Sequence, residues 1–193
     1  MNRYSIPFGL SASIALLCTA HAQNLVQNPN FDSDMSAWTT TIGNNWSNAH
    51  DHSDFQNGTG GSLQISTSTS DFALQCIPIN SNTPYVADVW IRKDPNPQFA
   101  QCSNPSYQVN YRFYSDGACQ NFLTAYLGLS FGDISTDWFD RRTILDSPPN
   151  TSTLQVAFVA TCGAANGSLT LYFDDVSVFG DKIFADDFDP HTQ

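Results

Sequence analysis

The stretch Tyr107-Gln108-Val109-Asn110-Tyr111-Arg112-Phe113-Tyr114 alternates between two kinds of side chain. Aromatic residues and a valine take the odd positions, while amides, an arginine and a tyrosine take the even ones. Successive residues of a β-strand point to opposite faces, so the alternation predicts a strand with one core face and one non-core face. The odd positions are the expected core.

Seven similar runs flank this stretch, and turn residues such as those of Asn82-Thr83-Pro84 separate them. No segment has a long helical period. The pattern predicts an all-β protein, a jelly-roll β-sandwich of about eight to ten antiparallel strands. The further runs are Leu63–Ile65, Phe72–Ile79, Tyr85–Ile91, Leu123–Phe131, Trp138–Leu145, Leu154–Thr161 and Leu169–Phe179.

The two ends of the chain do not share this pattern. Arg3, the apolar stretch Ile6–Cys18 and the motif Ala20-His21-Ala22 are typical of a signal peptide that ends at residue 22. We expect residues 23–180 to form one β-sandwich domain and residues 181–193 to form an acidic C-terminal tail. That tail resembles the endings of exported proteins from some Gram-negative bacteria. The protein is therefore predicted to be secreted or displayed at the cell surface.

The charge is strongly negative. All 18 acidic residues are Asp, against 7 Lys and Arg, which gives a formal net charge of −11. Such a balance argues against a nucleic-acid partner and against binding to anionic membrane surfaces. No apolar run beyond the signal peptide has the length of a membrane span, so we expect no membrane insertion.

Two adjacent acids stand in the last predicted strand. Counting by twos places Asp174 in phase with Val176 and Val178, on the apolar face, where a carboxylate needs a partner. Asp175 falls on the other face and is expected to be solvated. A bound cation or backbone N–H groups would each satisfy Asp174, and the residue pattern leaves both open.

The opening Asn24-Leu25-Val26-Gln27-Asn28-Pro29-Asn30-Phe31-Asp32, followed by Trp38, resembles the start of CenC-type carbohydrate-binding modules. The segment Tyr172–Val178 resembles their last strand, so the resemblance spans nearly the whole chain after the signal peptide. It implies a galactose-binding-like jelly roll, with Trp38 and Trp138 at structural positions. One departure is Asp32, where the family usually has Glu.

The resemblance also implies a structural calcium ion between the first and last strands. Asp32 and Asp174 would supply side-chain ligands, and Asn30 would offer its carbonyl oxygen. Aspartate has a shorter reach than the glutamate of the family, so Asp32 is the weaker member of this set.

Sugar recognition combines aromatic faces with amides and arginine. The non-core faces of two predicted strands carry such groups, and Trp46 stands in a polar segment that we expect to be a loop. These residues form the predicted glycan-binding set, although Trp90 would also fit a packing position beneath a loop. The set is Trp90, Arg92, Asn110, Arg112, Tyr114 and Trp46.

Other chemistry finds little support. His50-Asp51-His52 places two imidazoles on one face of an extended segment, but no third ligand follows at a fixed spacing, so we interpret it as a solvated loop. The nucleophile elbow, zinc-protease and phosphate-loop motifs are absent from the sequence. We expect a non-catalytic, exported module that binds a polysaccharide or cell-surface glycan. The alternatives are a structural or adhesive surface protein and a small hydrolase or lyase.

Four cysteines follow the signal peptide, which in an exported chain predicts two disulfides. One pairing joins Cys102 to Cys119 and Cys76 to Cys162. The other joins Cys76 to Cys119 and Cys102 to Cys162. The segments around Cys76 and Cys119 resemble exported sandwich proteins that carry these two cysteines alone, and this resemblance favours the second pairing.

Overall fold

The computed structural model describes residues 23–41, 44–48, 50–52, 61–67, 70–96, 105–130, 135–162 and 168–180. The predicted signal peptide, residues 1–22, and the predicted tail, residues 181–193, lie outside this part of the chain. Within the described residues there is no helix, and so none with the length and apolar character to cross a membrane.

The described residues form ten strands, in agreement with the predicted all-β class. They are β1 (Thr39–Thr40), β2 (Asn44–Ser47), β3 (Ser62–Thr67), β4 (Ser70–Pro78), β5 (Pro84–Lys93), β6 (Pro105–Tyr114), β7 (Phe122–Ser130), β8 (Phe139–Asp146), β9 (Thr153–Cys162) and β10 (Leu169–Gly180).

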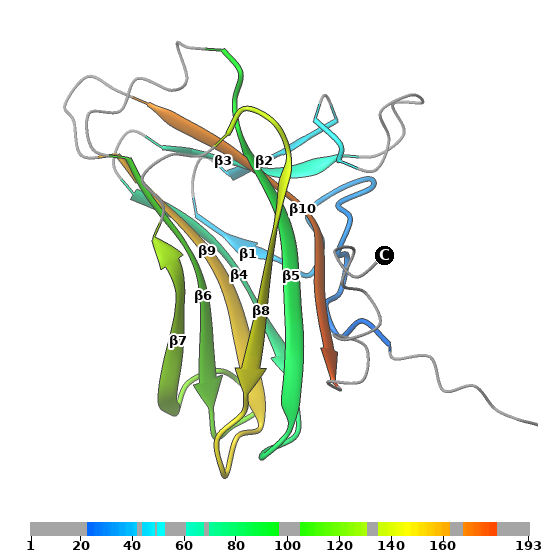
Figure 1. Ribbon diagram of the computed structural model, residues 1–193, viewed down its shortest axis with the longest axis vertical. Helices are drawn as coiled ribbons and strands as arrows, with labels where there is room; N and C mark the ends of the chain where they lie inside the picture. Colours follow the sequence, from blue (N-terminus) through cyan, green and yellow to red (C-terminus); the bar gives the residue numbers. More distant parts are fainter. Residues whose placement is uncertain are drawn as a thin grey trace, which may run out of the picture.

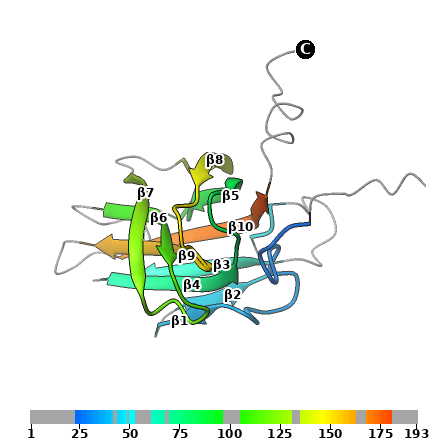
Figure 2. The same ribbon diagram turned by 90° about the horizontal axis from the view of Figure 1, so that it is seen from below.

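The strands form two five-stranded antiparallel sheets that face each other (Figures 1 and 2). Sheet A has the order β1-β4-β9-β6-β7, and sheet B has the order β2-β3-β10-β5-β8. Neighbours in each sheet are mostly distant in sequence, which is the arrangement of a jelly roll. The predicted jelly-roll β-sandwich is therefore confirmed.

The core lies between the two sheets, and the strand phases predicted for β5 and β6 are correct. The odd positions of both strands are buried in one apolar cluster, which includes Tyr85, Val89, Val109 and Phe113. Their even positions point to the outer faces, away from the partner sheet. These outer faces are the places where the fold can present side chains to a ligand.

The N-terminal segment lies along the last strand, and Figure 1 shows this segment in blue beside β10. The Leu25 N–H donates to the Val178 carbonyl at 2.9 Å, and the Val176 N–H donates to the Pro29 carbonyl at 2.9 Å. Trp38 joins the core as the resemblance implied, and it stacks on Phe158 with ring centroids 5.3 Å apart. The two ends of the domain are thus fastened together.

Candidate functional site

The predicted glycan-binding residues do not form one site. Strands β5 and β6 belong to different sheets, so their outer faces lie on opposite sides of the sandwich. Trp90 and Arg92 lie on the outer face of sheet B, because they alternate with the buried Val89 and Ile91. Asn110, Arg112 and Tyr114 lie on the outer face of sheet A.

The segment around Trp46 that we expected to be a loop is strand β2, and Trp46 lies on neither outer face. It stands opposite the buried Leu63 and packs partly buried against the core. Its indole N–H donates to the Phe31 carbonyl, and its ring lies against Gly61. These contacts place Trp46 in a packing position, where its ring is held by its own chain.

On the outer face of sheet B, Trp90 is half-buried beneath His52. The two rings stack with centroids 3.7 Å apart and an interplanar angle of 18°. The Trp138 ring meets the same imidazole edge-on at 5.6 Å, so Trp138 lies outside the core cluster that we expected it to join. The predicted solvated loop is also wrong at this point, since His52 packs on the sheet.

Arg92 lies among aromatic rings on the same face. Its guanidinium stands 5.2 Å from the Trp138 ring and 5.5 Å from the Tyr172 ring, and it donates to Nδ1 of His50. Burial lowers the pKa of Arg92, and burial followed by the Arg92 charge lowers the pKa of His50. An Nδ1 atom that accepts a hydrogen bond requires neutral imidazole, which agrees with this direction.

Tyr172 completes this cluster. Its hydroxyl donates to Asp94 at 2.5 Å, and its ring packs against His50 with centroids 4.0 Å apart. Burial, followed by the hydrogen bond to Asp94, raises the pKa of Tyr172. One polar atom of the cluster, Nε of Arg92, is buried without a hydrogen-bond partner among the described residues. The other groups occupy one another, so little of this face is left for a ligand.

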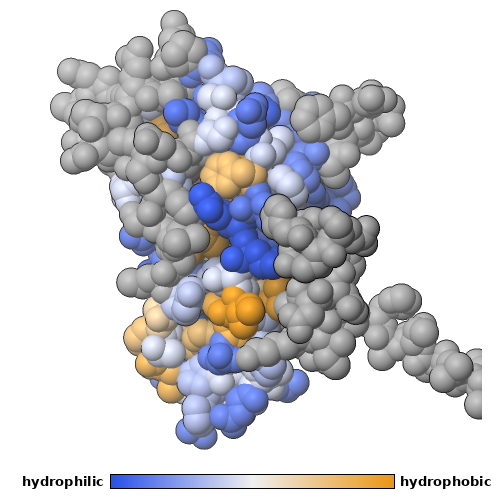
Figure 3. Space-filling view, viewed as in Figure 1, coloured by the Kyte–Doolittle hydropathy of each residue, from blue (hydrophilic) through white to orange (hydrophobic). Residues whose placement is uncertain are grey.

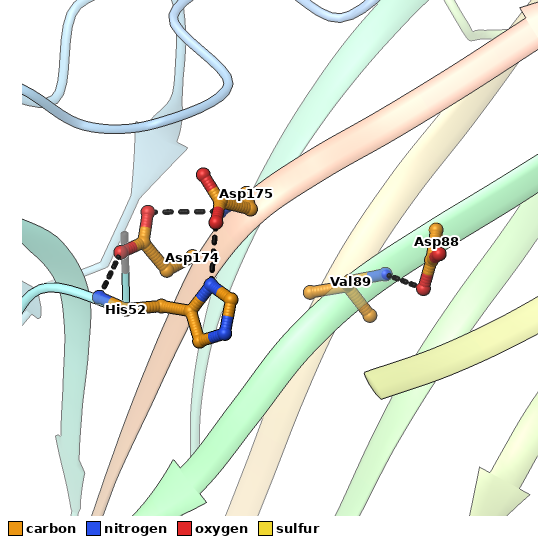
Figure 4. Close-up of polar contacts among 5 residues, drawn as sticks. All are labelled: His52, Asp88, Val89, Asp174 and Asp175. Atoms are coloured by element: carbon orange, nitrogen blue, oxygen red, sulfur yellow. Dashed lines mark hydrogen bonds and ion pairs between the residues drawn. The ribbon is translucent and has the colours of Figure 1, made fainter. Parts of the chain in front are cut away.

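The paired acids lie beside this cluster, and Figure 4 shows their contacts. Asp174 is fully buried and accepts two backbone hydrogen bonds of 2.8 Å, from the N–H of His52 and from that of Asp175. Burial raises the pKa of Asp174 to about 8, although both hydrogen bonds lower it. Oδ2 of Asp175 lies 2.5 Å from Nδ1 of His52.

The alternation that we predicted for the last strand does not continue past Asp174. Asp174 pairs with Trp90 on the outer face, whereas Val176 and Val178 are buried in the core. The register shifts between Asp174 and Ser177, and Asp175 takes a left-handed backbone conformation with φ of 46°. This β-bulge inserts one residue and reverses the alternation that follows. Asp175 is consequently half-buried against His52 and not solvated.

The predicted calcium ligands lie in different surroundings. Asp174 is buried with its oxygens facing backbone N–H groups, whereas Asn30 and Asp32 are exposed. In the part of the chain that the structure describes, no three His, Cys, Asp or Glu side chains are grouped to hold a metal ion. The predicted ligand set consists of two carboxylates and a backbone carbonyl, so this absence does not bear on it, and a calcium site stays a prediction.

The outer face of sheet A presents a different surface, which we call the sheet A platform. Asn110 is 2% exposed, and its Nδ2 donates to Oε1 of Gln108 at 3.1 Å. Its Oδ1 is buried without a hydrogen-bond partner among the described residues. The Tyr114 hydroxyl donates to Oε1 of Gln155 at 3.4 Å. The platform consists of Gln108, Asn110, Arg112, Tyr114, Phe122 and Gln155.

Phe122 extends this platform at the edge strand. It is 58% exposed, stands opposite Tyr114 and meets that ring edge-on with centroids 5.9 Å apart. In the view of Figure 3, which is that of Figure 1, the described surface is mostly hydrophilic with separate apolar patches. An exposed aromatic ring beside buried amides is the combination that sugar recognition uses.

A disulfide closes one end of the platform. Cys76 on β4 is bonded to Cys119 in the β6–β7 loop, 43 residues later. Asp116 shapes this loop by accepting hydrogen bonds from the N–H groups of Ala118, Gln120 and Asn121, and these bonds lower its pKa. The loop is thereby held against the end of β4.

This disulfide belongs to the second of the two predicted pairings. Cys162 also takes part in a disulfide, while its predicted partner, Cys102, lies outside the described residues. The first bond is therefore confirmed, and the link from Cys102 to Cys162 stays a prediction.

Sequence reasoning missed Gln155 and His52. Gln155 was hidden in an apolar run, although a single amide between Leu154 and Val156 was a signal for the outer face. His52 gave no such signal, because its contacts with Trp90 and Asp175 are between residues far apart in sequence.

No family model matches this chain, and no curated protein matches it. Solved structures do resemble it. A family 16 carbohydrate-binding module shares 17% identity, with a TM-score of 0.56, and the match covers 80% of this chain and 99% of the other. The CBM22-2 xylan-binding domain of Xyn10C from Paenibacillus barcinonensis shares 13% identity, with a TM-score of 0.55 over 79% and 98% of the two chains.

A third structure, TmCBM61 in complex with β-1,4-galactotriose, shares 11% identity, with a TM-score of 0.51 over 83% and 100% of the two chains. The three neighbours are single modules of about the same extent as the domain described here. Identities this low show the fold alone. The chain therefore has the jelly-roll fold found in carbohydrate-binding modules, while the CenC type itself stays a prediction.

Proposed function

We propose that this protein is an exported, non-catalytic carbohydrate-binding module that uses the sheet A platform to bind a polysaccharide or cell-surface glycan. The carrying observation is Asn110, a buried amide on the outer face whose Oδ1 lacks a partner among the described residues. Buried polar groups are normally hydrogen-bonded, so this oxygen is a candidate acceptor for a donor that the described residues do not supply. A sugar hydroxyl is such a donor.

The surrounding residues support the same ligand class. Gln108, Arg112 and Gln155 add amide and guanidinium groups, and the exposed ring of Phe122 offers a face for the C–H groups of a sugar. The likeness to carbohydrate-binding modules adds support at the level of the fold. Export follows from the predicted signal peptide.

The sheet B face supports a different role. Trp90 is half-buried under His52, and Arg92 is enclosed by Trp138 and Tyr172. This occlusion favours the second candidate, a structural or adhesive surface protein that has kept the sandwich without sugar binding. The two candidate functions therefore make opposite predictions for the effect of replacing Asn110 on glycan binding. Both give Trp90 a packing role.

A comparison of two variants tests the proposal. The purified protein is screened on an array of plant and bacterial polysaccharides, and the affinity for the best ligand is measured by calorimetry. We expect Asn110→Ala to weaken binding by about tenfold while changing the free energy of unfolding by no more than about 1 kcal/mol. Trp90→Ala should lower stability and leave the affinity unchanged.

Failure of the wild-type protein to bind any glycan would remove the proposal and leave the structural or adhesive candidate. Weaker binding by Trp90→Ala, with Asn110→Ala unaffected and both variants folded by circular dichroism, would move the site to sheet B.

A further inference from the structure

Arg112 is the single cation on the five strands of sheet A, within the strand bounds given above. The single acid on these strands is Asp71, which is buried at 3% exposure in the inward phase of β4. The platform therefore carries one positive charge and no carboxylate, although the chain as a whole has a net charge of −11.

Arg112 also differs from Arg92 and Arg142 in its surroundings. Arg142 forms an ion pair with Asp88 at 3.1 Å, and Arg92 interacts with the charges of Asp94 and Asp137. Among the described residues, no carboxylate lies within ion-pair distance of Arg112. The nearby loop acid, Asp116, directs its carboxylate to backbone N–H groups of its own loop.

The strand pairing places Arg112 beside groups that complete a recognition site. Arg112 stands opposite Gln155 on β9 and Ala125 on β7, and Asn110 stands opposite Ala157. Asn110, Gln155 and Ala157 are buried, whereas Arg112 is partly exposed. The half-buried guanidinium offers N–H donors in a planar fork, and the Asn110 oxygen two residues away requires a donor.

These two requirements define the ligand. One part of it must accept hydrogen bonds and carry negative charge, since a planar guanidinium pairs with a carboxylate through two parallel bonds. Another part must donate a hydrogen bond to Asn110. A uronic acid has both, a carboxylate on C5 and ring hydroxyl groups. A sulfated sugar also combines a negative group with hydroxyl groups, so the ligands tested must separate a carboxylate from a sulfate. We assign the carboxylate because its planar group matches the planar fork of Arg112.

We infer that the sheet A platform binds a uronic-acid polysaccharide, with Arg112 pairing with the carboxylate and Asn110 accepting from a ring hydroxyl. This inference rests on the proposed function and names its substrate class. The carboxylates of sheet B lie on the other side of the sandwich, about 10 Å away, and their repulsion of an anionic ligand weakens as the salt concentration rises.

Pectin provides a ligand pair with the same sugar backbone, in which the carboxyl groups are either free or methyl-esterified. We would measure the affinity of the full chain for polygalacturonate and for highly methyl-esterified pectin by affinity electrophoresis and calorimetry. Alginate and glucuronoxylan serve as further uronic-acid polymers, carrageenan as a sulfated polymer, and galactan and xylan as neutral ones. We expect at least one uronic-acid polymer to bind at least tenfold more tightly than the neutral and sulfated polymers.

Arg112→Gln tests the residue. This variant should lower the affinity for the uronic-acid polymer by about tenfold or more, because hydrogen bonds to charged groups are the strong ones. Arg112→Lys keeps the charge but loses the planar fork, and should show an intermediate loss. Arg142→Gln on sheet B makes the same change in net charge and should bind as the wild-type protein does.

The results separate this inference from the proposed function. Preferred binding to a neutral or sulfated polymer, or unchanged binding by folded Arg112→Gln, would overturn the uronic-acid assignment while glycan binding stands. An equal loss in Arg142→Gln would show a general charge effect and also overturn the assignment. If the protein bound none of these polymers, both the uronic-acid assignment and the proposed function would be wrong.

Discussion

Substitution of Asp174 by Asn tests how the buried carboxyl group is stabilised. Asp174 is fully buried, and burial raises its pKa from 3.8 to about 8. Each pKa unit corresponds to about 1.4 kcal/mol, so the fold opposes ionisation by about 6 kcal/mol. The folded state then binds more protons than the unfolded state between these two values. The contribution of Asp174 to stability is therefore highest below about pH 4 and decreases as the pH rises towards 8.

The expected change between pH 5 and pH 8 is a decrease of about 3 to 4 kcal/mol in the free energy of unfolding. The amide that replaces the carboxyl group does not titrate, so Asp174→Asn should lack this part of the pH dependence. The amide leaves one of the two backbone N–H groups without an acceptor, which costs about 1–3 kcal/mol at every pH. The difference in the free energy of unfolding between the wild-type protein and Asp174→Asn should therefore change with pH. The variant should gain stability relative to the wild-type protein as the pH rises to 8.

Urea denaturation of both proteins at several pH values, with EDTA present, measures this difference. Asp140→Asn, which removes an exposed carboxylate on β8, is the control for the charge change. Parallel pH curves for the wild-type protein and Asp174→Asn would refute the reasoning. The same series with calcium tests the predicted metal site. At a calcium concentration of 100 times the Kd, binding adds about 2.7 kcal/mol to the free energy of unfolding, and it should do so for the wild-type protein alone. An unchanged stability on adding calcium would count against that site.

Two further predictions concern the scaffold. Replacing both Cys76 and Cys119 by Ser should lower the free energy of unfolding by about 4 kcal/mol, because their bond closes a loop with a sequence separation of 43 residues. Urea denaturation measures this change, and a loss below about 1 kcal/mol would contradict the prediction. Gly61→Ala should destabilise the fold by about 1–3 kcal/mol, because an added Cβ would clash with Nε1 of Trp46. Thermal unfolding, monitored by tryptophan fluorescence, measures this effect, and an unchanged melting temperature would argue against the close contact.

The sequence alone determined the class of fold and the faces of its regular strands. Alternation is a local property, because it follows from the backbone geometry of a single strand. The odd positions of β5 and β6, from Tyr85 to Phe113, are therefore recognisable as core from the residue pattern itself. The Cys76–Cys119 bond was likewise predicted, although from a resemblance and not from the spacing of the cysteines.

The tertiary structure alone decided where those faces lie. Trp90 and Arg112 looked equivalent as outward residues, but the order of the strands put them on opposite sides of the sandwich. The bulge at Asp175 reversed the alternation of β10, and pairing with β3 made a strand, β2, of an expected loop. Strand order and bulges are set by pairing between residues far apart in sequence, and alternation within one strand carries no information about such pairing.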